Sequence, residues 1–305
     1  MATTKEMINS GLCALQDVLG TDISKGCVSQ IQAAKSIWAI APGESFRAGE
    51  DFESEKTRLI LASKLVILNN VNTFEENGSD DATETLADDT IGLTNEGKYK
   101  FLATFTNGMF FNKALHSIKG FRNWNIMIVD GKGVWGTKTT LGGLTGFTTG
   151  MIQPAKLQIG TNAAIQKEGL GFQFTDRTEL DVDFGFIVDS TARKQKGVTQ
   201  IELSFVNAPK ASDAVVTVKA VLAQDKSIVF SGIGFANFLI GKNATSSAPT
   251  GGADTTIPGT YPLATTAISV NDQITVKLFS ENTSVIVGPD GDYYKSNLLS
   301  ATAIA

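Results

Sequence analysis

The sequence is poor in the residues that usually carry chemistry. Its 305 residues hold a single histidine, His116, and two cysteines, Cys13 and Cys27. One histidine excludes a multi-histidine metal site, and two cysteines exclude a disulfide-based scaffold. The two cysteines lie fourteen positions apart, which matches no metal or redox spacing, so we expect them to be small buried residues of a reduced protein.

Charged residues are also scarce, at 19% of the chain against about 25% in an ordinary soluble domain. The 26 basic and 31 acidic residues give a net charge of −5, which argues against a basic nucleic-acid binder. No apolar run approaches the ~18 residues of a membrane span. The first residues do not form a secretory signal, because Glu6 follows Lys5 and Asp17 interrupts the apolar part. We therefore expect no signal peptide, no membrane span and synthesis in a cytoplasm.

Motif-like stretches have plain structural interpretations. Residues 131–136 match G-x-G-x-x-G, but the residues that follow are β-prone and rich in glycine, which favours a hairpin turn over a dinucleotide site. His116 lies within a predicted helix, where a solvated or core-edge histidine is favoured over a catalytic base. No G-x-S-x-G and no phosphate-binding loop motif occurs. We therefore predict no enzyme activity, no catalytic residues and no cofactor.

Carboxylates gather at two further places. Glu179, Asp181 and Asp183 would share one face of a strand predicted over 179–188, as a carboxylate pair, a Ca²⁺ site or solvent-facing polar positions, and the last is favoured. Residues 290–292 resemble part of a calcium loop but lack its downstream glutamate, which favours a turn. No metal site is predicted.

The densest charge lies in residues 75–89, which hold seven acids and no base. A turn at 77–79 and the polar composition predict a long loop, and such loops in compact domains are usually functional or mobile. The loop could bind divalent cations, repel or steer an anion, or simply be solvated. We assign it as a candidate assembly loop. Its acidic residues are Glu75, Glu76, Asp80, Asp81, Glu84, Asp88 and Asp89.

Hydrophobic patterns predict a mainly β protein, whose first domain spans residues 1–189 as a β-sandwich or barrel with one or two helices. Helical patterns cover 4–19, as an N-terminal extension, and 107–120, while 28–41 fits either a helix or a strand. A hairpin is predicted over 124–138, followed by a glycine- and threonine-rich connector. Further strands are expected at 58–68, 99–106, 151–159, 171–176 and 179–188.

The polar stretch 190–197 predicts a linker, and residues 198–305 have a different texture. Seven or eight short strands in about 100 residues predict an immunoglobulin-like β-sandwich. Residues 243–262 are low in complexity and are expected to form an exposed protrusion. The expected strands are 199–206, 214–222, 227–230, 235–240, 264–270, 274–279, 284–287 and 293–304.

A chain without a catalytic constellation can still act through its surfaces. Long β-rich segments with few charges present edges that pair with other subunits. A surface of low charge favours broad, permanent interfaces, and head-to-tail contacts between copies build rings or helical tubes. These features predict a homo-oligomer.

The element order of the first domain resembles the tail-tube family of tailed bacteriophages. The shared features are β-strands, one amphipathic helix (107–119), the hairpin 124–138 and a long acidic loop, with an added immunoglobulin-like domain as in many members. The resemblance implies a virion structural protein that forms stacked hexameric rings, contacts other virion proteins and conducts DNA without sequence-specific binding. It also implies that 69–97 is the inter-ring loop and that strands near 99–106 and 171–188 line the tube. One departure is an N-terminal segment of about 50 residues, longer and more helical than a minimal tube subunit requires.

Three alternatives remain open. A phage head-decoration, collar or capsid protein is the nearest, although no helical pattern here is long enough for the spine helix of a common capsid shell. A glycan-binding adhesin would expose clustered Trp and Tyr, whereas Trp38, Trp124 and Trp135 are dispersed and 293–294 is the only aromatic pair in the second half. A hydrolase is disfavoured by the single histidine.

Overall fold

The structure is a computed structural model in which the chain divides into two compact units. The first holds Met1–Leu59 and Lys64–Gln195, and the second holds Ile60–Ser63 and Lys196–Ala305. The predicted helix at 4–19 and both cysteines lie outside the described residues. The structure describes residue 31 and residues 33–85, 91–117, 123–189, 192–243, 245–250, 257–280 and 283–305.

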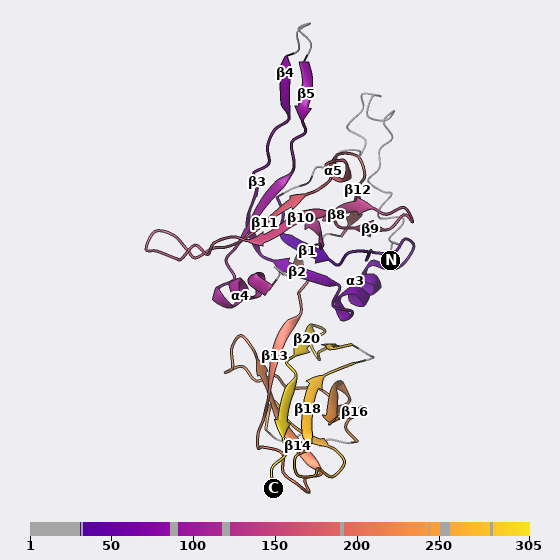
Figure 1. The fold of residues 1–305 in the computed structure, drawn as a ribbon, viewed down its shortest axis with the longest axis vertical. Coiled ribbons are helices and arrows are strands. Elements are labelled where there is room, and N and C mark those ends of the chain that lie inside the picture. The colour runs from indigo at the N-terminus through magenta and orange to yellow at the C-terminus, as the bar shows by residue number, and fades with distance from the viewer. Residues whose placement is uncertain are drawn as a thin grey trace. The chain divides into compact units, whose positions relative to one another are not determined.

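The first unit is built on two sheets (Figure 1). One has the strand order β12-β8-β7-β1-β2, with β9 paired to β8, and the other has the order β10-β11-β6-β3. The first sheet comprises β1 (Ser36–Ile40), β2 (Leu65–Asn69), β7 (Asn125–Val129), β8 (Gly133–Lys138), β9 (Leu144–Thr145) and β12 (Phe184–Val188). The second comprises β3 (Val71–Glu76), β6 (Lys100–Phe105), β10 (Thr149–Pro154) and β11 (Glu168–Phe174).

The two sheets enclose one hydrophobic core. Strand β1 contributes Ile37 and Ala39 to it, alongside phenylalanines of β6 and β11. Successive side chains of a strand point to opposite faces, so Trp38 and Ile40 lie on the other face of the sheet, where they are also fully buried. Helix α3 (Phe52–Leu61) covers that face, with Phe52 stacked on Trp38 at 6.2 Å between ring centroids. The apolar run of β1 is therefore explained by burial on both sides.

Three expected strands of this unit are partly wrong, and one of them, 151–159, already ends at Pro154 as β10. Residues 58–61 belong to α3, whose first turn is capped by Asp51, and the chain enters β2 only after Ser63, which has a φ of 56°. A short apolar run is compatible with either a helix or a strand, so the hydrophobic pattern of 58–68 could not distinguish between them. Residues 178–181 form the short helix α5, and only 184–188 form a strand. The predicted helix 107–120 is confirmed where described, as α4 (Met109–Ser117).

The second unit is a β-sandwich. Its sheets have the orders β17-β14-β13-β20-β19 and β16-β15-β18-β21, and alternate residues of both form one core, including Leu203, Val218, Ile240 and Val276. The first sheet comprises β13 (Thr199–Phe205), β14 (Val215–Leu222), β17 (Thr260–Ala264), β19 (Val285–Val287) and β20 (Tyr293–Ser296). The second comprises β15 (Phe238–Lys242), β16 (Thr245–Ser247), β18 (Gln273–Leu278) and β21 (Leu299–Thr302).

The chain passes repeatedly from one sheet to the other, for example from β14 to β15 and from β16 to β17. Four expectations here are wrong in detail, and the expected strand 293–304 is divided into β20 and β21. Residues 227–230 form no strand and make only an isolated bridge between Val229 and Val221, while 265–270 follow β17. Residues 235–237 form a 3-10 turn, and the expected protrusion contains β16 and the start of β17. The prediction of a mainly β chain is confirmed.

Candidate assembly site

In its described part, residues 75–85, the acidic segment is one side of a β-ribbon and not the expected loop. Strand β3 runs through Glu75 and Glu76, and Glu84 lies in a second pair of strands, β4 (Ala82–Thr85) with β5 (Ile91–Asn95). Alternating Thr with small or acidic residues suits an exposed strand, and every described side chain of β4 is exposed. Among the described strands, β4 and β5 pair only with each other (Figure 1). Asp88 and Asp89 lie outside the described residues.

Two unpaired legs join this outer pair of strands to the sheet. Residues 77–81 lead from β3 to β4, and 96–99 lead from β5 to β6. The legs run close together, since a Cβ on Gly78 would lie 2.4 Å from the Lys98 carbonyl and one on Gly97 would lie 2.1 Å from that of Ser79. Only glycine permits this approach. Backbone contacts between the legs are sparse, with Asn77 N–H donating to the Lys100 carbonyl at 2.7 Å.

A charged network fastens both legs to α5 (Thr178–Asp181). Arg177 pairs through Nη1 with Asp81 Oδ1 at 2.5 Å and through Nε with Asp181 Oδ2 at 2.6 Å. On the other leg, the Tyr99 hydroxyl donates to Asp181 Oδ1 at 2.6 Å. Asp81 Oδ1 also accepts the Gly97 N–H at 2.8 Å, which links the two legs directly. Arg177 therefore pairs with one carboxylate on a leg of the ribbon, Asp81, and with one on α5, Asp181.

The pKa shifts agree with this arrangement. The Gly97 N–H and the Arg177 charge favour the ionised carboxylate, and they hold the pKa of Asp81 below its usual value despite some desolvation. Asp181, then Asp81, raise the pKa of Arg177. The hydrogen bond to Asp181 raises the pKa of Tyr99, because that bond requires the protonated phenol. Asp81 and Arg177 therefore stay charged near neutral pH, and Tyr99 keeps the proton that it donates.

Helix α5 is itself held by local and long-range bonds. Asp176 Oδ1 accepts both the N–H and the hydroxyl of Thr178, at 2.8 and 2.7 Å, which starts the helical turn. Glu179 accepts the N–H of Thr148 at 2.6 Å and its hydroxyl at 2.7 Å. The expected common face of Glu179, Asp181 and Asp183 is therefore absent, because the first two lie in a helix and serve different partners.

The surroundings of Arg177 do not form a ligand pocket. Two hollows of about 170 and 260 Å³ adjoin it, below the ~300–1,000 Å³ of small-molecule sites. Across the part of the chain that the structure describes, no three His, Cys, Asp or Glu residues are grouped to hold a metal ion. The charged groups around Arg177 that line the hollows are Glu76, Asp80, Asp81, Glu96, Lys98 and Asp176.

A second exposed arm leaves the same sheet between β10 and β11. Bridges between Gln158 and Lys167 and between Thr161 and Ala164 make it a narrow hairpin. Its two isoleucines, Ile159 and Ile165, are 78% and 65% exposed. Residues 160–164 carry no charge, so the two exposed isoleucines flank an uncharged tip.

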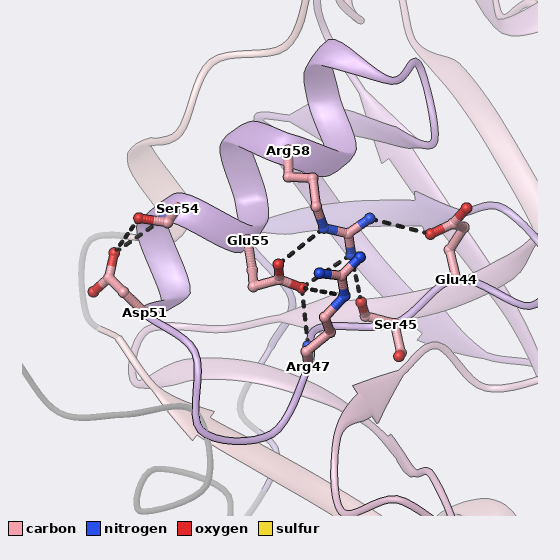
Figure 2. Close-up of polar contacts among 7 residues, drawn as sticks. All are labelled: Glu44, Ser45, Arg47, Asp51, Ser54, Glu55 and Arg58. Carbon is pink, nitrogen blue, oxygen red and sulfur yellow. Dashed lines mark hydrogen bonds and ion pairs between the residues drawn. The ribbon is translucent and has the colours of Figure 1, made fainter.

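A second charged cluster surrounds the buried Glu55 of α3 (Figure 2). Glu55, only 6% exposed, accepts two bonds from Arg58, each 2.9 Å, and the Arg47 N–H at 3.0 Å. Burial raises the pKa of Glu55, but these donors outweigh it and the net shift is downward. Arg58 also reaches the Ser45 carbonyl and Glu44. Both carboxylate oxygens of Glu55 accept hydrogen bonds, and all three nitrogens of the Arg58 guanidinium donate them. The network therefore joins α3 to the preceding loop and offers no reactive group.

The remaining sequence motifs are structural. The G-x-G-x-x-G stretch is the turn and second strand of the β7–β8 hairpin, as predicted, and no helix follows it. His116 is exposed near the end of α4. Asp290 accepts the Asp292 N–H and the Tyr294 hydroxyl, which confirms the plain turn.

Comparison with known proteins does not place the chain in a family. No protein-family model matches the chain, and no curated protein matches it. Within the described residues, no helix is long and apolar enough to cross a membrane.

Sequence reasoning missed Arg177, which organises the site. Its partner Asp81 lies 96 positions away, so no local spacing joins them. The available signal was Asp176 two residues before Thr178, which is typical of a side-chain turn and would have placed a helical start where a strand was expected.

Proposed function

We propose that the chain is a structural, self-assembling virion subunit of the tail-tube type, whose copies form stacked hexameric rings that conduct DNA. The proposal rests on the resemblance in element order and on one structural observation, the ribbon formed by β4 and β5. A virion head, collar or decoration protein is the alternative that the same experiment tests.

The ribbon is costly to order in a lone subunit. Fixing each backbone residue costs about 1–2 kcal/mol of conformational entropy, and an isolated two-stranded hairpin is marginal in water. Strand β4 buries no side chain that would offset this cost. A surface on another copy would provide the missing burial and pair the open strand edges. The ribbon is therefore best explained as a contact element.

Other features of the first unit support assembly. Strands β3 and β10 lie at the edges of their sheet, and the arm between β10 and β11 exposes Ile159 and Ile165. The five acids between Glu75 and Glu84, with no base among them, would repel DNA phosphates rather than bind them. This suits a conduit more than a binder.

The test is assembly of the purified chain with and without the ribbon. Residues 80–96 are replaced by Asn-Gly, a two-residue turn that can join the close-lying Ser79 and Gly97. Lys226→Gln, at an exposed ion pair of the second unit, is the control. Negative-stain microscopy should show six-fold rings and tubes for the wild type and control, and rings or monomers without tubes for the ribbon variant.

Two results would contradict the proposal. Monodisperse monomers of the wild type at high concentration would exclude self-assembly. Tubes of normal length from the ribbon variant would exclude the ribbon as the stacking element. The variant's tryptophan emission checks that it is folded, since all three tryptophans lie in the first unit.

A further inference from the structure

Two segments outside any strand separate the ribbon of β4 and β5 from the sheet that holds β3 and β6. The ladder of β3 with β6 ends at Glu76 and Phe101, and that of β4 with β5 begins at Ala82 and Asn95. Between them, residues 77–81 and 96–99 form no ladder, and Gly78 and Gly97 allow backbone rearrangement there. A pair of strands linked through such legs can change direction relative to the sheet unless side chains fix it.

The side chains that fix it all converge on α5. Arg177 holds one leg through Asp81, and Asp181 holds the other through Tyr99. Asp181 is the last residue of α5 and Arg177 directly precedes the helix, while Glu179 of α5 accepts bonds from Thr148, just before β10. The root of the ribbon is rigid, because Phe101 packs against Phe74 and Phe172 at 5.0 and 5.5 Å between centroids. Any change in the direction of the ribbon is therefore confined to the two legs, residues 77–81 and 96–99.

We infer that Arg177 is a latch, a positioning residue whose ion pair with Asp81 holds the ribbon in one direction in the free subunit. The pair is partly exposed, at 37% for Arg177 and 40% for Asp81, so salt weakens it and a competing charge on a neighbouring subunit could open it. The latch thus makes the ribbon's direction adjustable without unfolding the sandwich. Its consequence for stacking rests on the proposed function, whereas the latch itself is a property of the single chain.

The test is hydrogen exchange of the wild type and Arg177→Gln at low and at 1 M salt. Opening the latch should speed exchange of the described ribbon amides, 77–85 and 91–99, about tenfold or more at low salt while β7 and β8 are unchanged. High salt should raise the wild-type rates toward those of the variant and leave the variant unaffected. Arg47→Gln is the matched control, since Arg47 is 62% exposed and its carboxylate contact is 3.9 Å.

Ribbon rates within twofold of wild type in a folded Arg177→Gln variant would overturn the latch. Equal exchange rates of the wild-type ribbon amides at low and at 1 M salt would also overturn it. If Arg177→Gln fails to fold, Asp81→Asn gives the same readout, because it removes the charge from the ribbon side. Microscopy separates the two proposals: a wild type that never assembles defeats the proposed function, while the exchange data still decide the latch.

Discussion

The carboxylate of Asp130 accepts a hydrogen bond from the indole N–H of Trp135 at 2.9 Å. Its other oxygen accepts the N–H groups of Lys132 and Gly133, at 2.7 and 3.0 Å. Asp130 is fully buried, so these donors replace the water that a carboxylate would otherwise bind. One acidic side chain therefore closes the β7–β8 turn and orients a core tryptophan.

Asp130→Asn should destabilise the first unit by about 2–3 kcal/mol, because the new amide nitrogen would face the Trp135 N–H, donor against donor. Urea unfolding followed by tryptophan fluorescence measures it. Lys132→Ala in the same turn is the control and should stay within about 0.5 kcal/mol, since its side chain is exposed. Equal stability of Asp130→Asn and wild type would refute this role of the carboxylate.

Two glycines of the G-x-G-x-x-G stretch, Gly133 and Gly136, are required by strand packing. A Cβ on Gly133 would lie 2.0 Å from the Ile187 carbonyl, and one on Gly136 would lie 2.1 Å from that of Thr145. Gly136→Ala should therefore cost about 3 kcal/mol or more, or prevent folding. Gly171→Ala, whose nearest contact would be 3.6 Å, should be far milder. The order of soluble yields and unfolding midpoints checks this, and equal effects of the two substitutions would contradict it.

Glu55→Gln should lower the unfolding free energy of the first unit by about 1–3 kcal/mol, because Arg58 would lose the nearer of its two charged partners and keep only Glu44 at 3.4 Å. Arg47→Gln should cost less than about 1 kcal/mol, as it leaves the backbone N–H bond intact. The pKa of Glu55 lies below its ordinary 4.5 in the folded chain, so its contribution is complete above that value and is lost as the pH falls through the lower folded pKa. Denaturant titrations at pH 7 and pH 3 should show the difference between Glu55→Gln and wild type shrinking at the acid pH.

The sequence patterns were informative where one face of a strand is buried and a turn follows. The hairpin over 124–138 was predicted because apolar residues end at Asp130-Gly131-Lys132-Gly133, and it is confirmed. The strands 199–206 and 214–222 are confirmed for the same reason, since alternate residues such as Ile201 and Val216 enter a core. These are local properties that a window of residues contains.

The candidate site was less predictable because its contacts are long-range. The acidic residues between 75 and 84 were identified from the sequence. Their strands form only by pairing with the later strands β6 and β5, and the sequences of those strands do not indicate an exposed ribbon. Residues 179–183 alternate like a strand, yet the bond from Thr178 to Asp176 starts a helical turn that overrides the pattern. The pairing of Arg177 with Asp81 exists only once the sheet is folded.

The latch predicts a specific acid titration. The pKa of Asp81 lies below its ordinary 3.8 in the folded chain, so its hold on the ribbon is complete above that value and is lost as the pH falls through the lower folded pKa. The Gly97 amide resonance follows this step directly, since that N–H donates to Asp81 Oδ1. The other ionisable side chains nearby are Glu76, Asp80, Asp181 and Lys98, so the decisive comparison is between variants.

In Arg177→Gln the Gly97 resonance should titrate at a higher pH than in wild type, moving toward 3.8, because one favourable charge is gone while the Gly97 bond remains. The Ser227 amide, which donates to the remote Asp225, should titrate alike in both proteins. An unchanged Gly97 midpoint would mean that Arg177 does not act on Asp81 in solution. A shift in Gly97 alone would show that the ion pair operates where the ribbon meets α5.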